Sequence, residues 1–184
     1  MSTEPVKHHQ RACQGFGDVV IRVGNRWDRQ SPCPDWDARG VLEHVIGFHD
    51  VLILRPLDAK PTRPKDDPVA RWLVTVPAIF SVVEEHWNDS VTISGGATLD
   101  LGTLLPMLTT DVLVHTWDLA KAANVPVNLD PDLCEIVLAG ARQREEGLRA
   151  SGMFGPAVEG PPDAGVADEL VAFLGRNPDW PTNG

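Results

Sequence analysis

Basic residues are scarce in this chain of 184 residues, which has 16 lysines and arginines against 26 aspartates and glutamates and a formal net charge of -10. Proteins that hold nucleic acid or anionic lipid by electrostatic attraction need clustered Lys and Arg side chains. The composition therefore argues against nucleic-acid and membrane-surface partners, and it favours a small molecule as the ligand.

Long hydrophobic runs are also missing. No apolar run approaches the roughly 18 residues of a membrane-spanning helix, and residues 1–10 contain no hydrophobic core of a secretory signal. We therefore expect a cytoplasmic protein.

Cysteines are few, and they are Cys13, Cys33 and Cys134. They are widely spaced and form no C-x-x-C pair, so the sequence suggests neither a disulfide framework nor a zinc site made of thiolates. We expect three reduced thiols, of which Cys33 lies in a loop before a helix that carries a candidate ligand.

The remaining composition, 42% hydrophobic and 23% charged, is typical of a globular protein with a real core, and the length predicts a single domain over residues 1–184. Apolar residues recur at the spacing of amphipathic helices, and the segment 91–97 alternates too briefly to be more than an extended link. We expect an all-α fold, a four-helix bundle with the C-terminal tail and a short extra helix packed on it. The predicted helices cover 12–27, a segment from the cap Asp37 to Pro56, 72–87, 103–124, a segment after the cap Asp130, and 170–174.

Imidazoles occupy positions of these helices that should be apolar. His44 lies within the apolar stripe of the second helix. Asp111 and His115 lie four residues apart in the fourth helix, so their side chains project about 40° apart from one face. Burying such groups without partners is costly, and a shared cation removes the cost. His44, Asp111 and His115 would supply two nitrogens and one oxygen and leave positions open for water or substrate, which suits zinc, nickel, cobalt or iron(II) better than calcium or magnesium.

Other polar residues leave alternative roles open at the predicted site. Asp118 shares a face with His115, so it could replace Asp111 as a ligand, or it could orient His115 by a hydrogen bond without binding the metal itself. His49 points about 140° away from His44 around the helix, and we expect it to be structural, as we do His86 at a helix end. We expect His8 and His9 to belong to a disordered N-terminus.

Three segments resemble one known family. The segment 31–36 (SPCPDW) followed by 42–44 (LEH), the block 111–120 (DVLVHTWDLA), and the pair 154–158 (FGPAV) and 175–180 (GRNPDW) resemble actinobacterial metal-binding proteins of the DinB/YfiT-like superfamily. The similarity spans nearly the whole chain. The resemblance is strongest to the metal-binding domains of mycothiol-dependent maleylpyruvate isomerases.

The resemblance implies a ligand set and a chemistry. In that family a histidine on the second helix and a later acid-x-x-x-His pair hold the metal, and this pattern maps onto His44, Asp111 and His115, with Asp in place of the isomerase's Glu. It implies zinc as the favoured metal and mycothiol as a cosubstrate. Trp36 and Trp117, which stand in the matching motifs, are then expected to wall the cofactor site or to wedge helices together.

Several functions fit these residues. The first is a mycothiol-dependent transferase or isomerase that acts through a metal-bound thiolate, with Arg71 as a clamp for a substrate carboxylate and Asp118 in a catalytic role. The second is a hydrolase that activates metal-bound water, with Asp118 or Glu43 as general base. The others are a non-catalytic metal-binding or ligand-sensing protein and, less favoured in an all-helical fold, an iron(II) oxygenase. The sequence leaves the choice between monomer and homodimer open.

Overall fold

A computed structural model describes residues 3–93 and 95–181. The described chain is mainly helical, which confirms the predicted helical class. Its elements in chain order are α1 (Glu4–Arg22), α2 (Ala38–His49), the π-helical turn η1 (Asp50–Leu54), α3 (Pro68–Glu85), β1 (Ser90–Thr92), β2 (Thr98–Asp100), α4 (Leu101–Ala123), α5 (Pro131–Gln143), α6 (Glu145–Ala150) and α7 (Val166–Phe173).

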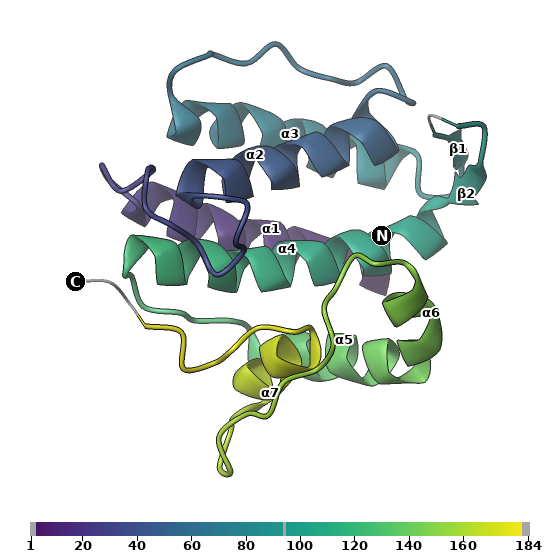
Figure 1. Cartoon of the computed structure of the whole chain (residues 1–184). Coiled ribbons are helices and arrows are strands. Elements are labelled where there is room, and N and C mark those ends of the chain that lie inside the picture. Colours follow the sequence, from purple (N-terminus) through teal and green to yellow (C-terminus); the bar gives the residue numbers. More distant parts are fainter. Residues whose placement is uncertain (1–2, 94, 182–184) are drawn as a thin grey trace.

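The helices α1, α2, α3 and α4 lie side by side (Figure 1). α1 packs against α3 and α4, and α2 also packs against α3 and α4. α5 packs on α4, and α7 packs on α5, so the C-terminal third of the chain covers the outer side of α4 (Figure 1). The chain therefore places α4 between two sets of helices.

This central position explains the burial of α4. Every residue from 108 to 120 is buried, including the polar Asp111, His115 and Asp118. A helix with apolar contacts on all sides has no face on which to expose a charge. The polar side chains of α4 must therefore find partners inside the protein.

Local chemistry fixes the helix ends. The Asp37 carboxylate accepts a hydrogen bond from the Gly40 N–H (2.7 Å), and Asp130 accepts one from the Leu133 N–H (3.2 Å), so both predicted caps are confirmed. Asp100 caps α4 by accepting from the Thr103 N–H (2.9 Å). Asn124 ends α4 in the left-handed region with φ 50°. The helix thus ends where the sequence predicts.

The first helix differs from its prediction. α1 begins at Glu4 rather than near residue 12, and it ends at Arg22, before Trp27. His9 is fully buried on this helix, so its assignment to a disordered terminus was wrong. The apolar stripe extends back to Val6, but the histidine in its middle hides the periodicity.

Short elements were also missed. β1 and β2 pair antiparallel, with Val91 opposite Leu99, whereas the sequence predicts only an extended link over 91–97. Among the helices of residues 3–93 and 95–181, none is both long enough and apolar enough to cross a membrane.

Two glycines hold the C-terminal segment against the loop after α6. Gly175 has φ 85°, and a Cβ placed on it would lie 3.1 Å from backbone atoms of Gly155. Only glycine allows both this dihedral and this approach. The contact joins the two C-terminal sequence motifs and positions the next residue, Arg176.

We expect Gly175→Ala to lower the free energy of unfolding by about 1–3 kcal/mol, because alanine is strained at this dihedral and its methyl group meets the Gly155 backbone. Denaturant titration followed by circular dichroism measures the change. The matched control is Gly15→Ala within α1, where an added Cβ meets no atom within 4 Å. Equal stabilities of the two variants would contradict the packing role of Gly175.

Candidate metal centre

α2 and α4 bring three candidate ligands together. His44 comes from α2, and Asp111 and His115 come from adjacent turns of α4. Oδ1 of Asp111 lies 3.0 Å from Nε2 of His44 and 3.4 Å from Nε2 of His115. One nitrogen or oxygen atom of each residue lies within 4.8 Å of the other two. The three residues singled out in the sequence therefore converge on one point.

Asp118 lies behind this centre. Its Oδ2 accepts a hydrogen bond from Nδ1 of His115 (2.9 Å), and it is fully buried. With its proton on Nδ1, a neutral His115 presents the lone pair of Nε2 toward Asp111 and His44. Of the two roles that the sequence allowed for Asp118, the geometry fits the orienting one.

Arg176 completes the network. Its Nε donates to Oδ1 of Asp118 (3.1 Å) and its Nη2 donates to Oδ2 (2.9 Å), while Nη2 also lies 3.0 Å from Sγ of Cys33. Burial alone would lower the pKa of Arg176, but Asp118 outweighs it and raises that pKa. Cys33, His115 and Asp118 also cluster at metal-ligand distances, but the Arg176 guanidinium already supplies the cation there.

The electrostatics of the centre are those of a tight ion cluster. Burial alone would raise the pKa of Asp111, but His115 and His44 outweigh it and hold that pKa well below its ordinary value. Burial would also lower the pKa of His115, yet Asp111 and Asp118 raise it well above its usual range. In the metal-free protein His115 is therefore a cation between two carboxylates.

One carboxylate oxygen of the centre takes no part in the hydrogen bonds described above. Oδ2 of Asp111 is buried and has no hydrogen-bond partner among the described residues. An unpaired buried carboxylate oxygen is costly, and a cation beside it removes the cost. With two imidazole nitrogens and one carboxylate oxygen converging, the donor set fits a divalent metal with open positions.

Aromatic side chains flank the centre. The Trp36 ring stacks on His44 with centroids 4.4 Å apart, and Phe48 stacks on His44 at 5.5 Å. A cavity of about 390 Å³ opens here, lined by the candidate ligands together with Trp36, Met153 and Arg176. A small ligand can therefore reach the open side of the centre.

Trp117, the other tryptophan that the sequence motifs associate with the site, lies away from the cavity. Trp117 is buried, and the Lys121 ammonium lies 5.2 Å from its ring centroid. It is not among the described residues that line the cavity.

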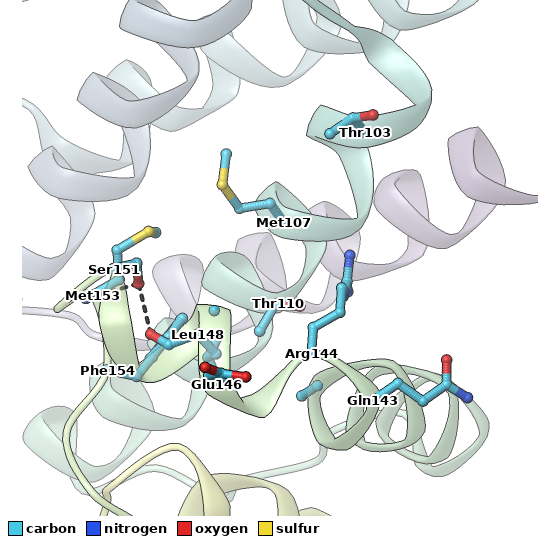
Figure 2. Close-up of a pocket in the computed structure, with 12 residues that line it drawn as sticks. Thr103, Met107, Thr110, Gln143, Arg144, Glu146, Leu148, Ser151, Met153 and Phe154 are labelled. Carbon is cyan, nitrogen blue, oxygen red and sulfur yellow. Dashed lines mark hydrogen bonds between the residues drawn. The ribbon is translucent and has the colours of Figure 1, made fainter.

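A larger cavity of about 560 Å³ adjoins the first, and Met153 lines both. Its walls are mainly apolar and come from α4 and from the segment around α6, including Met107, Leu148 and Phe154 (Figure 2). The loop that carries Met153 is held by Ser151, whose hydroxyl donates to the Leu148 carbonyl (2.7 Å) and accepts from the Met153 N–H (3.2 Å) (Figure 2). The candidate centre and this apolar cavity thus share Met153 as a wall.

Comparison with known proteins finds relatives in Mycobacterium tuberculosis. The "Uncharacterized protein Rv0738" of strain H37Rv is 31% identical over 193 aligned positions, which cover 94% of this chain and 98% of the relative. The "Uncharacterized protein MT0763" of strain CDC 1551 matches to the same extent. The chain belongs to the family of these mycobacterial proteins. No family model matches the chain, and no solved structure matches it.

Arg71 and Glu43, for which the sequence predicts roles at the centre, lie outside the cavity of His44. Arg71 donates to both carboxylate oxygens of Glu43, from Nε (2.7 Å) and from Nη2 (2.6 Å). This pair lines a separate polar cavity of about 550 Å³ beside Arg63 and Asp50, not the cavity of His44. Arg71 is thus no clamp at the metal centre, and Glu43 is no base there.

Arg176 is the residue that sequence reasoning missed. It lies 58 positions after Asp118, in the GRNPDW motif that was used only for the resemblance. A charged residue inside a motif of glycine, proline and tryptophan was the available signal. Its partner could not be read from the sequence because the two are joined only by tertiary packing.

Proposed function

We propose that this protein is a DinB/YfiT-like four-helix bundle, formed by α1 to α4, that binds a divalent metal through His44, Asp111 and His115. The observation that carries the proposal is the buried carboxylate of Asp111, whose Oδ1 faces two imidazole nitrogens and whose Oδ2 has no hydrogen-bond partner among the described residues. Hydrogen bonds of Asp118 hold His115 in the tautomer that a metal requires. The resemblance of the sequence motifs to metal-binding bundles supports the same assignment.

Zinc is the metal that the donors favour. Nitrogen and oxygen ligands from three side chains are typical of catalytic zinc sites with an open position, and cobalt, nickel and iron(II) accept the same donors. Calcium and magnesium prefer oxygen ligands alone. The aromatic walls of the cavity exclude part of the surrounding water, which strengthens binding of a charged ligand at the centre.

The proposed activity is that of a mycothiol-dependent transferase or isomerase. A divalent metal in such a site lowers the pKa of a coordinated thiol, which makes a thiolate nucleophile near neutral pH. The chain itself contributes the stacked Trp36 as a flat wall and Arg176 as the cation that faces the cavity. Arg176 takes the substrate-carboxylate role that the sequence had suggested for Arg71, and the adjoining apolar cavity takes the uncharged part of the substrate.

A hydrolase is less well supported. It needs a free general base at the cavity, but both oxygens of Asp118 accept hydrogen bonds and Glu43 lies in another cavity. The thiol-dependent activity requires no such base, because the metal alone favours the thiolate. We further propose that the protein acts in the cytoplasm, as a monomer or homodimer.

Titration of mycothiol into the cobalt-substituted protein tests the activity. We expect a change in the visible cobalt spectrum and a new sulfur-to-cobalt absorption band, since a thiolate enters the metal's coordination shell. S-methylated mycothiol is the control, because it fills the cavity without offering a thiolate. An unchanged spectrum at saturating mycothiol would refute the thiol-dependent function, and thiol-independent turnover of esters or amides would favour the hydrolase.

A further inference from the structure

A second cluster of ligand-type side chains lies in the core, outside the centre described above. His9 and Cys13 are one turn apart on α1, and His49 is the last residue of α2. All three side chains have no exposed surface. Nε2 of His9 lies 3.1 Å from Nε2 of His49 and 3.5 Å from Sγ of Cys13, and the three atoms all lie within 4.8 Å of one another.

The surrounding hydrogen bonds fix the protons of the two imidazoles. Nδ1 of His49 lies 2.6 Å from the Val45 carbonyl oxygen, which can only accept, so this nitrogen carries a proton. The Thr109 hydroxyl lies 2.7 Å from the Leu105 carbonyl oxygen and donates to it. The same hydroxyl oxygen therefore accepts from Nδ1 of His9 (3.2 Å), so that nitrogen is protonated as well.

With both protons on Nδ1, the two Nε2 lone pairs face each other. Burial, together with the repulsion between the rings, lowers the pKa of His9, and burial lowers the pKa of His49, so both rings are neutral. Moving the His9 proton to Nε2 would create a bond to His49. The Thr109 hydroxyl would then donate to Nδ1 of His9, while the Leu105 carbonyl oxygen keeps the helical N–H of Thr109 within α4. The arrangement with both protons on Nδ1 leaves the Nε2 lone pair of His49 without a donor in a dry core, and a cation between the two rings is an alternative partner for it.

The distances match those of a tetrahedral metal site. Zn–N bonds of about 2.0–2.1 Å and a Zn–S bond of about 2.3 Å at tetrahedral angles place ligand nitrogens about 3.4 Å apart and a nitrogen and sulfur about 3.6 Å apart. The distances from His9 to His49 and to Cys13 are 3.1 and 3.5 Å. Two of the three ligand spacings are therefore already close to those of a zinc site.

We propose that His9, Cys13 and His49 form a second, buried site for zinc or a similarly soft transition metal, which joins α1 to α2. Two imidazoles and one thiolate are typical zinc donors, and full burial indicates a structural rather than a catalytic ion. Binding of the divalent ion forms the metal–sulfur bond and releases the Cys13 proton to water. The Asp111 carboxylate, whose charge reaches both His9 and His49, offsets part of the added positive charge.

A variant in which Cys13 is the only cysteine tests the site directly. Cys33→Ser with Cys134→Ser leaves the proposed ligands untouched, and the zinc X-ray absorption spectrum of this protein reports whether sulfur binds the metal. We expect a sulfur ligand at about 2.3 Å from part of the bound zinc. A spectrum with nitrogen and oxygen ligands only, in protein saturated with zinc, would overturn the proposal.

Cobalt titration separates this site from the first. His44→Ala removes a ligand of the first centre only, and we expect it to keep about one equivalent of cobalt with a sulfur-to-cobalt absorption band. Cys13→Ser should lose that band, whereas Cys33→Ser and Cys134→Ser should keep it. Persistence of the band in folded Cys13→Ser protein, or its absence from the folded His44→Ala protein, would refute the second site whatever the outcome at the first.

Discussion

His44→Ala is expected to weaken zinc binding at the first centre by more than about 100-fold. Loss of an outer partner of a metal ligand alone costs about 10- to 100-fold in affinity, and this change removes a ligand. The His44 side chain is 26% exposed, so its truncation leaves the buried core of α2 in place. Competition of the protein with a zinc chelator measures the affinity.

His86→Ala is the matched control for this experiment. His86 ends α3 and bonds to Asp89 (2.7 Å), and it belongs to neither ligand cluster among the described residues. It should bind zinc like the wild type. A His44→Ala protein that keeps wild-type affinity and stoichiometry would show that His44 is no ligand.

The second large effect is expected at Asp118. Asp118→Ala should lower the free energy of unfolding by about 3–5 kcal/mol, because it leaves the largely buried guanidinium of Arg176 without its anion and removes one of the two carboxylates beside His115. Both oxygens of this fully buried carboxylate accept hydrogen bonds, so no other group in the network can replace it. Urea unfolding of the metal-free protein measures the loss.

Asp130→Ala provides the comparison for Asp118. Asp130 also pairs with an arginine, Arg11, and caps α5, but this pair is partly exposed. Loss of the cap should cost about 1 kcal/mol. If Asp118→Ala costs no more than Asp130→Ala, the buried network does not stabilise the fold in the way its geometry indicates.

The local features of the fold were predictable from the sequence. The caps Asp37 and Asp130 follow from side chains that bond to the adjacent backbone, and α4 ends at Asn124 because asparagine tolerates the left-handed conformation. The spacing of Asp111 and His115 also puts both on one face of any helix that contains them. These features depend on neighbours within one or two turns, so they needed no knowledge of the packing.

Other features could not be derived in this way. His9 looked like part of a polar terminus, because a histidine interrupts the apolar stripe that continues to Val6. Arg71 looked free, because its partner Glu43 lies on another helix. The hairpin of β1 and β2 and the short α6 are too brief to show a periodicity.

The sequence by itself determined most of the long helices, the caps Asp37 and Asp130, and the shared helical face of Asp111 and His115. The tertiary structure decided the role of Asp118, because the packing of the C-terminal segment brings Arg176 to its carboxylate, where Nδ1 of His115 and the Cys33 thiol also donate. It also decided that His9 and Cys13 face His49, since the contact joins residues 40 positions apart. Short-range hydrogen bonds and periodicity are encoded locally, whereas the partner of a buried charge or imidazole depends on which helices lie side by side.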